Sequence, residues 1–116
     1  MSHPVTIWHN PRCGKSREAL KLIEKEGIAP DVVRYLDNAP GEAELRAVLK
    51  MLGITARDLM RTKEALYKEL GLQNVTDEDT LIKAMAEHPK LIERPVVIKE
   101  GRAVIGRPPE KVLELL

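Results

Sequence analysis

The sequence of 116 residues contains no phenylalanine, one tryptophan and two tyrosines. A hydrophobic core must therefore be built almost wholly from aliphatic side chains. Hydrophobic residues make up 43% of the chain, which is an ordinary proportion for a globular protein. A chain of this length can bury one core, so we expect a single domain that covers residues 1–116.

The sequence also lacks long apolar runs and a clear excess of either charge. No run approaches the length of a membrane span, and the N-terminus has no apolar segment of the signal-peptide kind, so we expect no membrane partner. The 19 basic and 18 acidic residues leave a net charge of +1, which argues against nucleic-acid binding by bulk charge.

Cysteine occurs once, as Cys13. One cysteine cannot form an internal disulfide, and without an export signal we expect the protein in a reducing cytoplasm. The stretch VTIWHNPRCGKSREAL combines a strand-like run, a turn with proline and the start of a helix. Within it, CGKS admits two interpretations: a phosphate-binding loop, or a nucleophilic cysteine at a helix N-terminus.

The phosphate-loop interpretation fails on spacing. The motif G-x-x-x-x-G-K-[ST] needs a glycine where this chain has His9, and Pro11 has no amide proton to offer a phosphate. The cysteine phosphatase pattern C-x5-R also fails, because Cys13 and Arg17 lie too close together. Cys13 is therefore the candidate for chemistry in this stretch.

The periodicity predicts the elements on both sides of Cys13. Residues 5–8 read as a strand, a helix follows up to Gly27, and residues 31–36 read as a second strand. A strand, a helix and a strand within about thirty residues form a βαβ unit, so the two strands should be parallel.

The middle of the chain has the spacing of helices. Leu45, Val48, Leu49 and Leu52 recur at helical intervals, and Gly53 follows them as a C-cap. Capping-box pairs predict two further helix starts, the first followed by Leu59, Met60 and Leu66, and a proline predicts the end of the last helix. The pairs are Thr55 with Asp58 and Thr76 with Asp79, and the end is at His88-Pro89.

The last third of the chain predicts a hairpin and a helix. Residues 95–98 and 103–106 read as its strands, joined by a turn at 99–102, and RPPEKVLELL reads as a helix with proline in its first turn. The whole order is β-α-β, a helical insert at about 40–90, then β-β-α. We therefore predict an α/β, thioredoxin-like fold: a four-stranded mixed sheet with a helical insert between strands 2 and 3.

This arrangement makes Cys13 a candidate nucleophile. At the start of a helix, unpaired backbone amides and the helix dipole favour the thiolate, and Arg12, Lys15 and Arg17 add positive charge nearby. The alternative is a small buried residue, which is the usual place of a lone cysteine. The flanking turn residues favour the nucleophile.

The hairpin register brings two arginines to the same edge. With a four-residue turn, paired residues have numbers that sum to 201, and Arg94 and Arg107 satisfy this sum. Both would lie near Cys13, and an arginine fork donates paired hydrogen bonds to oxyanions. The alternative is that both are solvated surface charges. A thiol beside two arginines predicts chemistry on a small oxyanion.

Three blocks of the sequence resemble the glutaredoxin-coupled arsenate reductases. HNPRCGKSR resembles their signature H-N-P-x-C-x-x-S-R, and ERPVV and GRPPEKVLELL resemble their two later blocks. The likeness covers nearly the whole chain. Lys15, RTKEALYKELGL and GRPPE resemble a less well characterised branch, whose physiological substrate is poorly defined.

The resemblance implies a reaction and a set of residues. Cys13 would attack arsenate, glutathione would be the co-substrate, and glutaredoxin would be the protein partner; no bound cofactor and no metal are implied. The implied arsenate-binding residues are Arg61, Arg94 and Arg107. The implied supporting residues are His9, Asn10, Ser16, Arg17 and Pro95. Residue spacing alone does not distinguish Arg61 from Arg57.

Three of these supporting residues carry more specific expectations. His9 either lowers the pKa of the thiol or binds backbone groups of its loop. Ser16 either donates to the thiolate or caps the helix, and the cap is favoured. Pro95 opens a strand and, by resemblance to thioredoxin-like proteins, should follow a cis peptide bond.

Other classes of protein share parts of this pattern. Spx-type regulators of RNA polymerase use the same fold without enzymatic activity, but their C-x-x-C switch has Ser16 in place of its second cysteine here. Monothiol glutaredoxins carry C-G-F-S, which is close to CGKS, yet three arginines have no place in them. A thiol oxidoreductase that acts on another substrate is a further alternative.

Overall fold

The computed structural model describes residues 4–116. The chain divides into two compact units. The first contains the chain up to Asn38 together with Arg94–Leu116, and the second is Ala39–Glu93. That the whole chain forms one domain stays a prediction.

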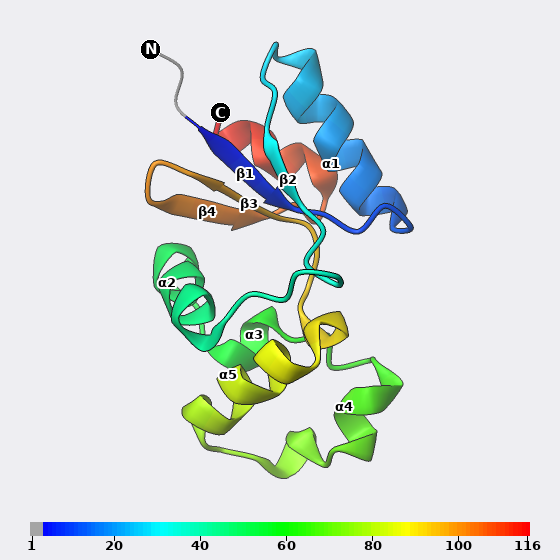
Figure 1. The fold of residues 1–116 in the computed structure, drawn as a ribbon, viewed down its shortest axis with the longest axis vertical. Coiled ribbons are helices and arrows are strands. Elements are labelled where there is room, and N and C mark those ends of the chain that lie inside the picture. The colour runs from blue at the N-terminus through cyan, green and yellow to red at the C-terminus, as the bar shows by residue number, and fades with distance from the viewer. Residues whose placement is uncertain (1–3) are drawn as a thin grey trace. The chain divides into compact units, whose positions relative to one another are not determined.

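The first unit contains a four-stranded mixed sheet (Figure 1). Its strands are β1 (Val5–Trp8), β2 (Asp31–Val33), β3 (Val96–Lys99) and β4 (Arg102–Ile105), in the order β2-β1-β3-β4. β1 pairs with β2 in parallel and with β3 antiparallel, and β3 and β4 pair antiparallel. The predicted mixed sheet and its parallel first pair are confirmed.

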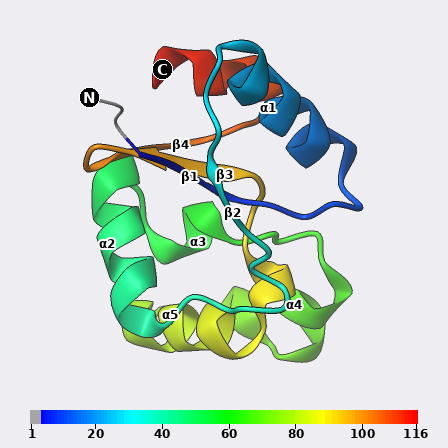
Figure 2. The same ribbon diagram turned by 45° about the horizontal axis from the view of Figure 1, so that its top comes forward.

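One face of this sheet is covered by α1 (Gly14–Lys25) and by the 3₁₀ helix η3 (Pro109–Glu114), as Figure 2 shows. Ala19 and Ile23 lie one turn apart on α1, so both point into the core beneath that helix. Burial of one aliphatic side chain contributes roughly 1.5–3 kcal/mol, and this core contains no aromatic residue. Its buried residues are Val5, Ile7, Ala19, Ile23, Val97, Val112 and Leu115.

The β3–β4 hairpin has the predicted register. Val96 pairs with Ile105 and Lys99 with Arg102, so paired residue numbers sum to 201 as expected. The strands extend one pair further toward the turn than predicted, because the turn itself has only two residues. Glu100 and Gly101 both have positive φ, 51° and 74°, which suits the right-handed twist of a tight hairpin.

The second unit is helical, and its elements lie between β2 and β3 in the chain, as predicted. They are α2 (Glu42–Leu52), α3 (Ala56–Leu59), α4 (Ala65–Glu69), η1 (Leu72–Asn74), α5 (Glu78–Glu87) and η2 (Pro89–Leu91). Gly53 closes α2 in the left-handed conformation with φ 68°, where a side chain would be strained. Thr55 and Asp58 form the predicted capping box of α3.

Two predicted helix boundaries in this unit are wrong. The segment after Thr55 forms only one helical turn, because Met60 turns to an extended conformation and forms an antiparallel bridge with Ile92. The N-cap of α5 is Asp77 rather than Thr76. The Asp77 carboxylate accepts a hydrogen bond from the backbone N–H of Thr80 at 3.1 Å.

Two predicted boundaries in the sheet unit also differ. β2 ends at Val33 rather than at position 36, because the carbonyl of Arg34 accepts hydrogen bonds from the backbone N–H groups of Asp37 and Asn38 and so closes a turn. The last helix is 3₁₀ rather than α. The backbone N–H of Lys111, for example, donates to Pro108 in an i to i+3 bond of 3.0 Å. None of the helices in residues 4–116 has the length and apolar character that a membrane span requires.

We expect Gly106→Ala to destabilise the sheet unit. A methyl group at Gly106 would lie 2.8 Å from Cγ of Pro95 and 3.2 Å from Cγ1 of Val112, so the proline ring or the helix η3 would have to shift. Such overpacking costs roughly 1–3 kcal/mol, measurable as a lower midpoint in chemical unfolding.

Gly41→Ser is the control for this substitution. Gly41 has open space around its Cα and a φ of −76° as the N-cap of α2, where serine is a good capping residue. The Gly41→Ser variant should be no less stable than the wild type. If Gly106→Ala is as stable as the wild type, the prediction is wrong, because the Pro95 ring would then have moved aside at no cost in stability.

Candidate active site

Cys13 lies at the N-cap position of α1, directly after the turn that follows β1. Asn10 shapes this turn. Its carbonyl accepts a hydrogen bond from the backbone N–H of Cys13 at 3.0 Å, and its side-chain oxygen accepts one from the N–H of Arg12 at 3.0 Å. The predicted place of the thiol, at the start of the first helix, is confirmed.

Opposing effects act on the thiol pKa. Burial of Cys13 raises the pKa, because an apolar environment disfavours the thiolate. Hydrogen bonds from the backbone N–H of Ser16, from the Arg94 side chain and from the backbone N–H of Lys15 lower it, and so does the positive charge of Arg94. The lowering effects prevail, so the pKa of Cys13 lies below the ordinary value of a cysteine thiol.

The structure brings Arg94 and Arg107 together beside this thiol. Nε of Arg107 donates to the carbonyl oxygen of Arg94 at 2.8 Å, and Nη2 of Arg107 lies 3.8 Å from Sγ of Cys13. The backbone N–H of Gly106 donates to the carbonyl of Pro95 at 2.8 Å, which continues the hairpin register to the residues next to the two arginines. Both guanidinium groups thus belong to the surroundings of one sulfur atom.

The peptide bond between Arg94 and Pro95 is cis, as expected from the fold. A second cis bond, between Arg107 and Pro108, was not predicted. Each of the two arginines is therefore followed by a cis proline.

His9 and Ser16 form a buried pair beneath the thiol loop. Nδ1 of His9 lies 2.6 Å from Oγ of Ser16, and the backbone N–H of Asn10 donates to the same oxygen at 3.0 Å. Burial lowers the pKa of His9, and the positive charges of Arg34 and Arg17 lower it further. The His9 side chain contacts the Ser16 hydroxyl rather than a backbone group of its loop, and its role toward the thiol stays a prediction.

The favoured role of Ser16 as a helix cap is wrong. Its hydroxyl is fully buried against His9 and Asn10, and α1 has no side-chain capping bond. What Ser16 offers the thiol is its backbone N–H. Position 16 lies inside the first turn of the helix, where the amide points toward the N-cap residue.

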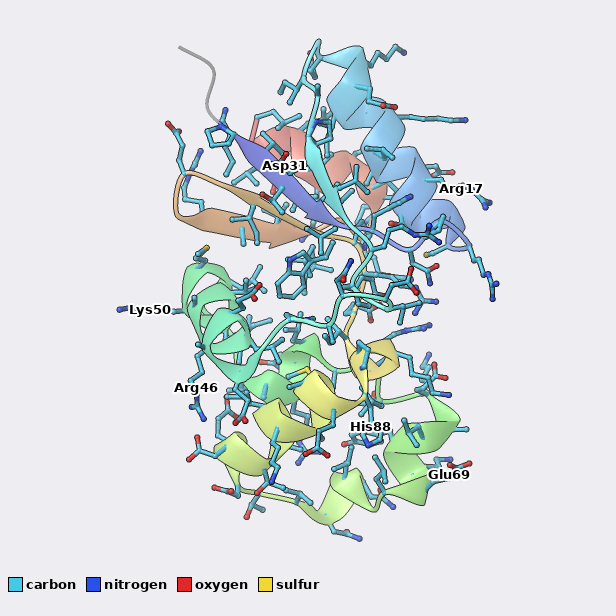
Figure 3. The ribbon with its side chains drawn as sticks, viewed as in Figure 1. Arg17, Asp31, Arg46, Lys50, Glu69 and His88 are labelled. Carbon is cyan, nitrogen blue, oxygen red and sulfur yellow. The ribbon has the colours of Figure 1, made fainter. Side chains whose placement is uncertain are left out.

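Arg17 lies on the exposed side of the first turn of α1 (Figure 3). Its Nη1 donates to the carbonyl oxygen of Pro11 at 3.1 Å, so the side chain fastens the outer part of the loop. Arg12, Lys15 and Arg17 were expected to supply the positive charge that stabilises the thiolate. The side chain that lowers the pKa of Cys13 is instead Arg94.

Arg61 belongs to the helical unit, where it is half-buried between two carboxylates. Its Nη1 lies 3.4 Å from Glu64, and its Nε lies 3.7 Å from Glu93. Arg57, the other candidate in this segment, has a structural role. Its guanidinium donates to the Tyr67 hydroxyl and to the carbonyl oxygens of Leu72 and Val75. That Arg61 binds an anion stays a prediction.

Tyr35 is a residue in contact with Arg94 that the sequence patterns did not indicate. It is fully buried just beyond the end of β2. Burial opposes the charge of Arg94, but Cys13 and the Tyr35 hydroxyl both interact with the guanidinium and raise its pKa above the ordinary value. The parallel βαβ unit was a signal, because it places the ends of β1 and β2 at one edge of the sheet.

Residues 4–116 contain no group of three or more histidine, cysteine, aspartate and glutamate side chains that could hold a metal ion. The polar groups around Cys13 are instead guanidinium and backbone N–H groups. Donors of this kind bind anions, because they carry positive charge or the positive end of a dipole. The site can therefore hold an oxyanion against a nucleophilic sulfur.

Known proteins resemble this chain over nearly its whole length. The model of the ArsC family matches residues 8–115. An arsenate reductase of Neisseria meningitidis serogroup A is 51% identical over 97% of each chain. Protein YfgD of Escherichia coli strain K12, described as uncharacterized, is 53% identical over 100% of this chain and 99% of its own length.

The solved structures include an arsenate reductase from Vibrio cholerae. It superposes on this chain with a TM-score of 0.97 at 52% identity, and 100% of each chain is covered. This likeness confirms the predicted fold.

We expect the pKa of Cys13 to lie below about 8.5, the value of a free thiol. Thiolate absorbance in the ultraviolet, or the rate of alkylation by iodoacetamide, should rise as the pH passes upward through this pKa. Arg94→Ala should raise the pKa, because the variant loses both a hydrogen bond and a positive charge at the sulfur.

Arg102→Ala is the control for this titration. Arg102 is an exposed cation of β4 whose Nη2 lies 3.4 Å from the carbonyl of Leu115, and its loss should leave the thiol pKa unchanged. A pKa at or above the free-thiol value in the wild type would contradict the prediction.

Proposed function

The chain belongs to the ArsC family, and on this basis we propose that it reduces arsenate to arsenite, with Cys13 as the nucleophile and glutathione and glutaredoxin as the source of electrons. The observation that carries the proposal is the single thiol at the N-cap of α1, with Nη2 of Arg107 3.8 Å from its sulfur and with a pKa that the α1 amides and Arg94 lower. The names of the relatives, arsenate reductases at about half identity, support the choice of oxyanion.

The first step is binding and attack. The guanidinium groups of Arg94 and Arg107 each offer paired N–H donors, which match the oxygen atoms of a tetrahedral anion. The Cys13 thiolate forms a bond to arsenic, and one arsenate oxygen leaves as water after it takes up protons. The lowered pKa of Cys13 supports this step, because the thiolate is the nucleophilic form.

The second step supplies two electrons. Arsenic passes from the +5 to the +3 state, and two thiols that join in one disulfide release the two electrons required. The chain has only one cysteine, so the second thiol must come from another molecule. We propose glutathione: its thiolate attacks the adduct, arsenite leaves, and Cys13 remains joined to glutathione.

The last step restores the enzyme. A glutaredoxin thiolate attacks the glutathione sulfur of the mixed disulfide, so that the Cys13 thiolate is the leaving group. The hydrogen bonds that stabilise the thiolate also make it a better leaving group, because a thiol of lower pKa leaves faster. This cycle needs no bound cofactor and fits a reducing, cytoplasmic setting.

Arg61 is the third proposed arsenate ligand, and the family resemblance is the main reason for choosing it. Within the helical unit its backbone is fixed: the N–H of Arg61 donates to the carbonyl of Leu91 at 2.7 Å, and the N–H of Glu93 donates to Leu59 at 2.8 Å. Its side chain is half-buried and pairs with Glu64 at 3.4 Å.

We expect the purified protein to form arsenite from arsenate only when both glutathione and glutaredoxin are present. Omission of either should stop turnover after at most one equivalent, because Cys13 cannot be regenerated. Cys13→Ser should be inactive but folded, since serine is of similar size. Arsenite formation by Cys13→Ser would refute the proposed nucleophile.

We expect Arg61→Lys, Arg94→Lys and Arg107→Lys to lose activity, because a lysine ammonium cannot reproduce the fork of two donors. Each lost charge-assisted contact should lower the stabilisation of the transition state by roughly 1.5–3 kcal/mol, about ten- to a hundredfold in kcat/KM. Arg→Ala variants should be affected at least as strongly.

Three other arginines are the controls for these variants. Arg46 pairs with Asp79 at 2.9 Å on the exposed surface of the helical unit (Figure 3), and Arg12 and Arg102 are also exposed. Their alanine variants should keep nearly full activity. Full activity in the lysine variants, or equal losses in the controls, would refute the arginine site.

A further inference from the structure

Tyr35 is a buried polar residue that the proposed mechanism does not use. It has no exposed surface, and its hydroxyl oxygen is buried, as is Nε of Arg94. Burial of a hydroxyl group in an apolar environment is unfavourable unless a polar partner compensates for it. Arg94 is such a partner, because its guanidinium interacts with the Tyr35 hydroxyl.

The sheet explains how these two residues meet. β1 lies between β2 and β3, and Trp8 at the end of β1 is paired with both Val33 and Val96. Tyr35 follows β2 and Arg94 precedes β3, so the two leave the sheet on opposite sides of β1. Both do so at the edge where β1 continues into the loop of Cys13.

The chain makes a tight turn where Tyr35 lies. The carbonyl of Arg34 accepts hydrogen bonds from Asp37 and Asn38 at 2.9 Å each, and the backbone N–H of His9 donates to Val33 at 2.8 Å. The tyrosine backbone is thereby held to the same strand end as the thiol loop. Because the backbone of Tyr35 is fixed in this way, its side chain can hold the flexible side chain of Arg94 in one orientation.

We propose that Tyr35 is a positioning residue: its buried hydroxyl holds the Arg94 guanidinium toward the Cys13 sulfur and toward the oxyanion that the site binds. An arginine side chain has several rotatable bonds, and its restriction before binding lowers the entropy lost when the anion binds. This inference rests on the proposed oxyanion site and adds a residue to it. Tyr35 itself does not touch the reacting atoms.

The test is Tyr35→Phe, which removes one oxygen atom and keeps the ring in the core. Two measurements on Cys13 need no turnover: its pKa, from the pH dependence of alkylation by iodoacetamide, and the concentration of sodium arsenate or phosphate that halves the alkylation rate. We expect a raised pKa and roughly five- to tenfold weaker protection by either anion, about the effect of one ordinary hydrogen bond, because Tyr35 acts on the anion only through Arg94. The melting temperature should stay close to that of the wild type.

Tyr67→Phe is the matched control, because the Tyr67 hydroxyl also binds an arginine, Arg57, in the helical unit. This variant should lower stability and leave the Cys13 pKa and the protection by anions unchanged. The double variant Tyr35→Phe, Arg94→Lys should bind anions no more weakly than Arg94→Lys alone, because the two residues act through one group.

The outcomes separate this inference from the proposed function. Unchanged pKa and protection in Tyr35→Phe would overturn the inference, even if the wild type reduces arsenate. Additive losses in the double variant would also overturn it. If Tyr35→Phe behaves as expected while the wild type forms no arsenite, the inference stands and the proposed reaction is wrong.

Discussion

The candidate site depends on one interaction, the attraction between the sulfur of Cys13 and the backbone N–H groups at the start of α1, which lowers the pKa of the thiol. The βαβ unit creates it, because β1 ends at Trp8 and α1 begins at Gly14, with Cys13 as the N-cap residue. Cys13 is thus the N-cap residue of α1, although its side chain makes no capping hydrogen bond. The negative charge of the thiolate formed there is stabilised by the positive charge of Arg94.

The sequence predicts those parts of the site that follow from backbone geometry. The helix start after a strand places Cys13, and the sum of residue numbers in a hairpin pairs Arg94 with Arg107. Both rest on periodicity and turn length, which are local properties of the chain. The fold class follows from the same order of elements. The reduction of arsenate, by contrast, came from a family resemblance and not from spacing.

The remaining features depend on contacts between side chains that no local pattern records. Arg57 and Arg61 lie on the same stretch and are the same residue type. Only the tertiary contacts of Arg57 with Tyr67 reveal its structural role. Ser16 fits the composition of a cap, but His9 reaches its hydroxyl from the other end of the loop. The sequence pattern predicts Tyr35 as a strand residue. In the structure β2 ends at Val33, and Tyr35 is buried in the turn that follows.

The first turn of α1 differs from those of α2 and α5. α5 has an aspartate cap, Asp77, and both α2 and α5 have acidic residues in their first turn, whereas α1 has neither feature. An acidic residue there would stabilise the helix by about 0.3–1 kcal/mol. It would also raise the pKa of Cys13 and repel an oxyanion. α1 therefore lacks a local stabilisation that α2 and α5 have, and its N-terminal amides remain available to a negative sulfur.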